Sequence, residues 1–161
     1  MFPKMPIFKS SLLVLSACLL LLTQSVSADV GGSPSPSPWE NAPEHVQKSM
    51  NLIDEERFDA AIDELNQVLG NHPDDADVLN LLGFSHRSQG AYDKALEYYV
   101  AALTSDPAHK GAMEYLGELY LQTNQLEKAE MQLEALSDVC TFCKERKMLR
   151  KAIRKYKSKN S

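Results

Sequence analysis

The chain has 161 residues, of which 43% are hydrophobic and 24% charged, and its formal net charge is −5. This length suits one domain and excludes a large multidomain protein. The charge is uneven: residues 29–143 hold 6 basic and 21 acidic residues (net −15), whereas residues 144–161 hold 9 basic and 1 acidic residue (net +8). Because the body is acidic and the tail basic, the two parts are expected to attract partners of opposite charge.

The first 28 residues have the pattern of a secretory signal peptide. Two lysines precede an apolar run at residues 12–22, and a small-residue cleavage site ends at Ala28. The run is shorter than the ~20 residues of a spanning helix, which favours cleavage over retention as an anchor. Residues up to Cys18 resemble a bacterial lipobox, so a lipid anchor at Cys18 is an alternative. The sequence predicts a periplasmic or secreted protein that begins at Asp29.

Residues 29–41 are predicted to form a linker, because the segment is rich in proline and serine. The single tryptophan, Trp39, lies near its end. We expect Trp39 to cover the open end of the first helix pair, with exposure for recognition as the alternative.

Helix boundaries after the linker follow from proline, glycine and capping residues. The last helix has Leu149, Ile153 and Tyr156 at helical spacing, and we expect it to cover the exposed face of the helix before it. The predicted helices span residues 43–55, 58–69, 75–88, 93–106, 110–123, 126–140 and 144–157.

Several residue types recur every 34 positions along the middle of the chain. A fixed period of this length is typical of a stacked helical solenoid, so the sequence predicts an all-α fold. The repeated sets are Pro73 and Pro107; Gly83 and Gly117; Ala61, Ala95 and Ala129; and Phe58, Tyr92 and Leu126.

The middle repeat carries the clearest pattern, with Leu82-Gly83, Tyr92, Ala95, Tyr99, Ala102 and Pro107. This spacing resembles the tetratricopeptide repeat (TPR). The resemblance implies a TPR-type helical solenoid of about three helix-turn-helix repeats at residues 42–75, 76–109 and 110–143, then a basic capping helix and tail at 144–161. The third repeat departs from the pattern with Leu133 at the aromatic position, and the first with Ser49 at the glycine position.

The resemblance also implies a concave groove, lined by the first helix of each repeat, that binds a partner. Phe84 is expected either to be partly exposed, as a binding hot spot, or to be buried against the neighbouring helix. Carried over position by position, the groove residues are Val46, Met50, Ile53, Asn80, Phe84, Arg87, Glu114, Glu118 and Leu121.

Such a groove implies a protein or peptide partner. Some members of the family clamp the C-terminal carboxylate of a chaperone with lysine, asparagine and arginine side chains. Here Gly111 and Glu114 stand where such a clamp would need cations or a neutral face, so we do not expect this mode of binding. An acidic rim with one arginine favours an apolar partner of net basic charge. We expect no nucleic acid, and membrane contact only through a lipid on Cys18 or an uncleaved signal peptide.

Cys140 and Cys143 are the two cysteines left after cleavage. An even pair in an exported protein suggests a disulfide, and their spacing on a helical turn is compatible with one. Free thiols and redox or metal handling are the alternatives. Lys144 replaces the histidine of a haem-attachment motif, and the four histidines are too scattered to complete a zinc site.

No nucleophile–base pair, paired catalytic acids or glycine-rich phosphate loop occurs, so the sequence predicts no enzyme, no cofactor and no metal site. The basic tail could touch anionic lipid or nucleic acid, but a solvated capping helix is its expected role. The predicted function is an exported adaptor or scaffold that binds proteins through its groove, for example in assembly of an envelope complex. The alternatives are a self-associating structural protein and a thiol-redox factor.

Overall fold

The computed structural model describes residues 43–160. The predicted signal peptide, Cys18, the linker and Trp39 lie outside these residues. Within them the chain forms η1 (Glu44–Val46), α1 (Gln47–Asp54), α2 (Phe58–Asn71), α3 (Ala76–Ser88), α4 (Tyr92–Ser105), α5 (Lys110–Gln122), α6 (Leu126–Val139) and α7 (Lys144–Lys159). No strand occurs in this range, and the all-α prediction is confirmed.

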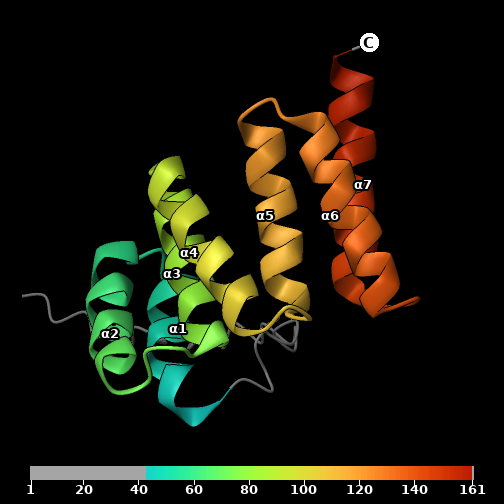
Figure 1. Ribbon diagram of the computed structural model, residues 1–161. Helices are drawn as coiled ribbons and strands as arrows, with labels where there is room; N and C mark the ends of the chain where they lie inside the picture. Colours follow the sequence, from blue (N-terminus) through green and yellow to red (C-terminus); the bar gives the residue numbers. More distant parts are fainter. Residues whose placement is uncertain (1–42, 161) are drawn as a thin grey trace, which may run out of the picture. The chain divides into compact units, whose positions relative to one another are not determined.

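The helices pack in sequential pairs (Figure 1). Helix α1 packs on α2, α3 on α4 and α5 on α6, while α2–α3 and α4–α5 contacts join the successive pairs. Helix α7 covers α6 as expected, and it also packs along α5. None of the helices between residues 43 and 160 combines the length and apolarity needed to cross a membrane.

The turn inside each pair contains one residue with a positive φ. These residues are Glu56 (φ 55°), Gly90 (φ 78°) and Asn124 (φ 59°), and they lie 34 positions apart. The left-handed conformation suits glycine and is tolerated by asparagine, but it strains a glutamate. All three turns therefore have the same backbone conformation, but in the first repeat a glutamate, which is unfavourable in that conformation, occupies the position.

The close approach of α3 to α4, and of α5 to α7, depends on glycine. A Cβ atom on Gly83 would come within 2.6 Å of the Tyr99 ring in α4, and one on Gly117 within 2.6 Å of the Leu149 side chain in α7. Leu149 therefore lies over Gly117 as Tyr99 lies over Gly83. Helix α7 thus contributes to the packing of the third pair and does more than cover its end.

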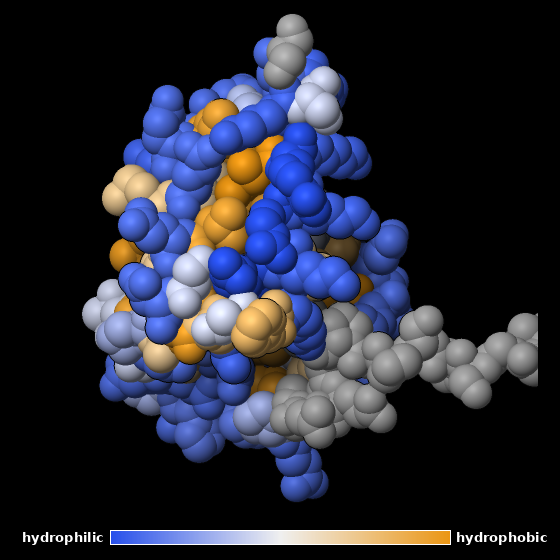
Figure 2. All heavy atoms as spheres, turned by 90° about the vertical axis from the view of Figure 1, so that its right-hand side faces the viewer, coloured by the Kyte–Doolittle hydropathy of each residue, from blue (hydrophilic) through white to orange (hydrophobic). Residues whose placement is uncertain are grey.

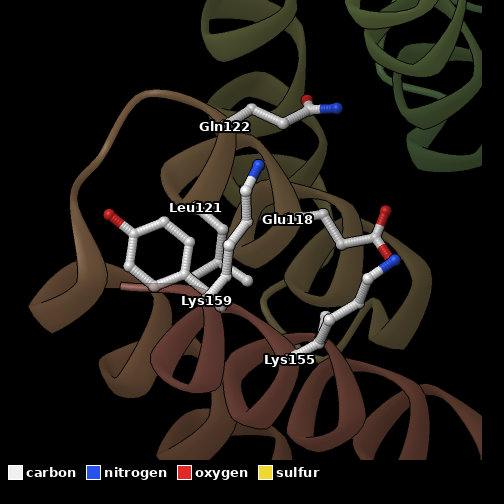
Figure 3. A pocket seen from close by; sticks show the side chains of 7 residues that line it. Glu118, Leu121, Gln122, Lys155 and Lys159 are labelled. Carbon is white, nitrogen blue, oxygen red and sulfur yellow. The ribbon is translucent and has the colours of Figure 1, made fainter. Parts of the chain in front are cut away.

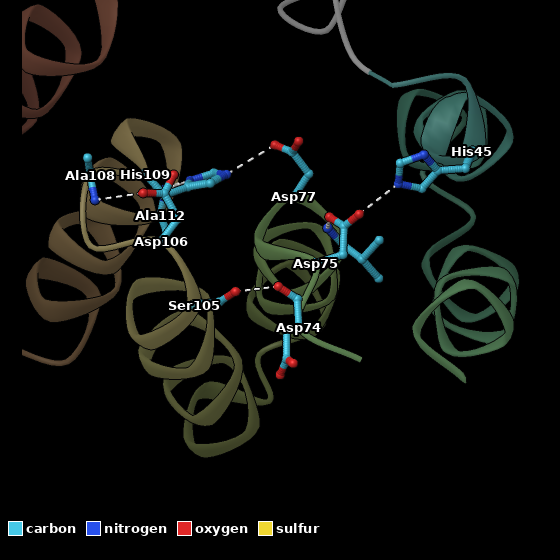
Figure 4. A network of polar contacts seen from close by, with 10 residues as sticks. His45, Asp74, Asp75, Asp77, Ser105, Asp106, Ala108, His109 and Ala112 are labelled. Carbon is cyan, nitrogen blue, oxygen red and sulfur yellow. Dashed lines mark hydrogen bonds and ion pairs between the residues drawn. The ribbon is translucent and has the colours of Figure 1, made fainter. Parts of the chain in front are cut away.

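A polar network links the first turns of η1, α3 and α5 (Figure 4). His45 Nε2 lies 2.8 Å from Asp75 Oδ2, and His109 Nε2 lies 3.1 Å from Asp77 Oδ1. His109 Nδ1 also accepts a hydrogen bond from the backbone N–H of Ala112, which caps α5. The hydrogen bond from His109 holds the pKa of Asp77 below its ordinary value. These contacts fix neighbouring pairs at one edge of the stack.

Candidate partner-binding pocket

Three of the predicted groove residues lie in the core of the first pair. Val46, Met50 and Ile53 are 0%, 2% and 5% exposed, and they pack in one cluster with Leu65 and Leu82. The apolar side of η1 and α1 is the side that packs on α2 and α3. These side chains therefore stabilise the first pair and offer a partner almost no surface.

Asn80 and Glu114, which are equivalent residues of successive repeats, are each 3% exposed. In the described part of the chain, Asn80 Oδ1 and Glu114 Oε1 have no hydrogen-bond partner. Burial, with a smaller contribution from the charges of Glu118 and Glu145, raises the pKa of Glu114 to about 8. Glu114 is therefore mostly protonated at neutral pH and adds little of the acidic character expected of the groove.

Phe84 is half-buried and packs against the neighbouring pair. Its ring centroid lies 5.2 Å from that of Tyr115 in α5. The guanidinium carbon of Arg87 lies 5.4 Å from the Phe84 ring centroid and 5.5 Å from that of Tyr115. These aromatic and cation–π contacts join α3 to α5, so Phe84 serves at least partly in packing.

Arg87 is held by polar contacts from two further helices. Its side chain is 10% exposed, and Nη2 lies 3.2 Å from Glu118 Oε2. Nε donates to the hydroxyl of Tyr99 at 3.3 Å, and Nη1 donates to Gln122 Oε1 at 3.4 Å. Arg87 is thus a structural link between α3, α4 and α5, and its ion pair neutralises Glu118.

An accessible pocket of about 330 Å³ lies between α5 and α7 (Figure 3). Of the predicted groove residues, Glu118 and Leu121 line it. Leu121, Ala152 and Tyr156 contribute apolar side chains to its lining. Lys155 and Lys159 extend from α7 toward α5, and the amine of Lys155 points toward the carboxylate of Glu118 (Figure 3). The full lining is Glu118, Leu121, Gln122, Ala152, Lys155, Tyr156 and Lys159.

Helix α7 is positioned by both apolar and polar contacts. Leu149 and Ile153 are 0% and 4% exposed and pack in the core shared with α5 and α6. Near the other end of α7, the Tyr156 hydroxyl donates to Asn124 Oδ1 at 3.1 Å, and Lys157 pairs with Glu130. These contacts hold α7 against α5, α6 and the turn between them.

Sequence reasoning missed the α7 half of this pocket. Ala152, Lys155, Tyr156 and Lys159 are spaced i, i+3, i+4 and i+7, which places them on one helix face. The sequence instead led us to expect Tyr156 in the apolar stripe that covers the preceding helix, and the lysines on a solvated capping helix. Only the docking of α7 on α5 shows that this face meets Glu118 and Leu121.

The cysteine pair lies at the α6–α7 junction. Cys140 follows α6, Cys143 precedes α7, and their Cα atoms are 5.8 Å apart. A disulfide spans this separation, so the fold accommodates the predicted bond, which stays a prediction. Among residues 43–160, no group of three or more histidine, cysteine, aspartate or glutamate residues is arranged to hold a metal ion.

Comparison with known proteins identifies the family to which this helical architecture corresponds. Two family models, both described as tetratricopeptide repeat, match residues 47–109 and 86–153. No curated protein matches the sequence.

Similar solved structures include three TPR-fold proteins. The Yersinia enterocolitica type III secretion chaperone SycD, in complex with a peptide of the translocator YopD, is 18% identical with a TM-score of 0.63, covering 73% of this chain and 92% of that one. The first TPR of Spaghetti bound to an HSP90 peptide is 15% identical with a TM-score of 0.63, covering 72% and 90%. The Sgt2 TPR domain from Aspergillus fumigatus is 18% identical with a TM-score of 0.64, covering 78% and 82%.

At these identities the solved structures show the fold, and the two family models together extend from α1 to α7. The 34-residue period, the stacked helix pairs and these matches agree. The chain belongs to the tetratricopeptide repeat family.

Proposed function

We propose that this protein is an exported adaptor that holds a segment of a partner protein in the α5–α7 pocket. TPR proteins are typically scaffolds or adaptors, and the fold supports a role in protein–protein interaction. The observation that carries the proposal is the pocket itself. Its lining combines apolar side chains with two lysines, and it includes two of the expected groove residues, Glu118 and Leu121.

The lining suggests the chemistry of the bound segment. An apolar side chain would rest on Leu121, Ala152 and Tyr156, and an acidic group would face Lys155 and Lys159. Glu118 is already paired with Arg87 at 3.2 Å. We therefore favour an apolar segment with an adjacent acidic residue over the net basic segment that the sequence predicted.

The solved neighbours support a peptide as the bound form. SycD was solved with a peptide of a translocator, and the Spaghetti domain with an HSP90 peptide. For this chain, a pocket of about 330 Å³ is at the lower end of ligand-site volumes, which suits a short segment.

Export is part of the same proposal. We propose that cleavage after Ala28 releases the protein into the periplasm or the medium, where it assists assembly of an envelope complex. An oxidising compartment favours the disulfide between Cys140 and Cys143.

Fractionation and N-terminal sequencing test the proposed export. A mature N-terminus at Asp29 in the exported fraction supports it, and an intact N-terminus in the cytoplasm contradicts it.

Selection from a displayed peptide library tests the pocket. We expect enriched peptides to carry an apolar residue beside Asp or Glu. Their affinity, measured by fluorescence polarisation, should fall at least about tenfold in Lys155→Glu/Lys159→Glu, because attraction becomes repulsion. Lys94→Glu/Lys110→Glu makes the same charge change on exposed residues outside the pocket and should bind like the wild type. Equal loss in both variants, or no enrichment, contradicts the proposal.

A further inference from the structure

The face of α7 turned away from the core carries a row of cations. Leu149 and Ile153 mark the buried face. Lys147, Lys151 and Arg154 follow at i, i+4 and i+7 on the opposite face, and all three are exposed. At 1.5 Å rise per residue, this row extends over about 10 Å of the helix.

These cations are not neutralised by the rest of the described chain. Elsewhere on α7, Lys157 pairs with Glu130, and Arg146 donates to Ser137 and to the Thr141 carbonyl. Within residues 43–160, the cations in the row have no ion-pair partner.

The positive charge of the protein is concentrated at one end. Residues 43–143 hold 6 basic and 19 acidic residues, a net charge of −13, whereas α7 alone contributes 9 basic residues. An anionic surface would therefore be repelled by the body and attracted by α7. Figure 2 shows the side formed by the last helices, where hydrophilic side chains surround an apolar strip.

An exposed aromatic side chain lies just before the start of this basic helix. Phe142 is 96% exposed and precedes α7 by two residues, and Met148 in the second turn of α7 is 49% exposed. A row of cations without an apolar neighbour could bind any polyanion. A cationic helix beside an exposed apolar anchor suits the interface of an anionic bilayer, where headgroups meet the cations and the ring enters the acyl boundary.

We propose that the outer face of α7, with Phe142, docks this protein on an anionic phospholipid surface. Neither a lipid on Cys18 nor an uncleaved signal peptide is needed for this contact. The row of Lys147, Lys151 and Arg154 is distinct from the pocket face of α7. The docking therefore does not depend on the proposed adaptor function.

Vesicle sedimentation tests the electrostatic half of the proposal. The described helices all lie within residues 43–160, so the chain from Asp29 onward retains every one of them and lacks the predicted signal peptide. We expect binding to vesicles of 70% phosphatidylcholine and 30% phosphatidylglycerol, release in 0.5 M NaCl, and little binding to pure phosphatidylcholine. Lys147→Glu/Lys151→Glu should weaken binding at least about tenfold, whereas Lys94→Glu/Lys110→Glu should match the wild type.

Insertion of residue 142 distinguishes a membrane from another polyanion. In a Trp39→Phe/Phe142→Trp variant the sole tryptophan reports on this position, and its emission should shift to the blue on anionic vesicles. Phe142→Ala should weaken vesicle binding and leave binding to heparin, a soluble polyanion, unchanged. Absence of vesicle binding, equal loss in both charge variants, or heparin binding as tight as vesicle binding with no blue shift would overturn the proposal. Circular dichroism confirms that each variant is folded.

Discussion

Equivalent positions of the first and third repeats differ in what covers them. Met50 and Ile53 are 2% and 5% exposed inside the core of the first pair, whereas their counterparts, the half-buried Glu118 and the 8%-exposed Leu121, line the pocket between α5 and α7. The difference comes from the neighbouring helix. Met50 and Ile53 pack in one core with residues of α2 and α3, whereas Glu118 and Leu121 lie where α7 packs on α5 and a pocket is left between the two helices. In this fold, the packing partner of a helix decides whether a groove position lines a pocket.

Removing the anchor of α7 should have the largest effect on this contrast. Leu149→Ala deletes a fully buried side chain that packs over Gly117, and we expect it to lower the free energy of unfolding by about 2 to 5 kcal/mol. Urea denaturation measures the loss. Met148→Ala, at a half-exposed neighbouring position, is the control and should cost far less. Similar losses in both variants would mean that Leu149 does not anchor α7.

The two close-approach glycines should respond differently to a methyl group. In Gly83→Ala the new Cβ meets the rigid Tyr99 ring at 2.6 Å, and overpacking should cost roughly 1 to 3 kcal/mol. In Gly117→Ala it meets the ends of the flexible Leu149 side chain, which can rotate away. Thermal unfolding should therefore show a clearly lower midpoint for the first variant than for the second. The reverse order would contradict this account of the third pair.

Neutralising Glu114 should stabilise the protein at high pH. Its folded-state pKa of about 8 lies above the ordinary 4.5, so the folded state retains a proton that the unfolded state releases between these values. The contribution of Glu114 is therefore most favourable below pH 4.5 and is lost as the pH rises toward 8. Glu114→Gln should raise the stability at pH 8 by roughly 1 to 3 kcal/mol and flatten this slope. Glu127→Gln, at an exposed position, is the control, and equal effects of the two substitutions would refute the assignment.

Relief of the strained first turn should give the smallest effect. Glu56 has φ 55°, and Glu56→Gly should stabilise the protein by about 1 kcal/mol because glycine adopts this conformation freely. Asn124→Gly changes an equivalent residue that tolerates the conformation and should give a smaller gain. Denaturation midpoints of the two variants make the comparison. A loss of stability in Glu56→Gly would show that the turn is not strained.

Much of the fold could be predicted because the residues that define the repeat act on the local backbone and on close packing. Prolines and glycines mark the helix ends, and small residues such as Gly83 and Ala95 mark close packing. The turn conformation of Glu56 was not predicted, because a glutamate carries no local signal for a positive φ. It becomes evident only from its alignment with Gly90 and Asn124.

The binding surface was harder to predict because it depends on contacts between distant segments. Family positions predicted groove residues on the first helix of each repeat, but burial of Val46 depends on its packing with α2 and α3. Arg87 was predicted as the one arginine of an acidic groove, and the ion pair with Glu118 that leaves its side chain 10% exposed has no local signal in the sequence. The α7 half of the pocket required knowledge of how that helix docks.

Site-specific photo-crosslinking in the native host tests most directly whether a partner occupies the pocket. A photoreactive amino acid in place of Gln122, an exposed residue of the pocket lining, should capture a partner that mass spectrometry identifies. The same amino acid in place of Glu127, which is exposed on α6 outside the lining, should not. We expect the crosslink from position 122 to be lost when Lys155→Glu/Lys159→Glu is added, because these substitutions reverse the charge of the pocket. Crosslinks of equal strength from both positions, or none from Gln122, would contradict the account.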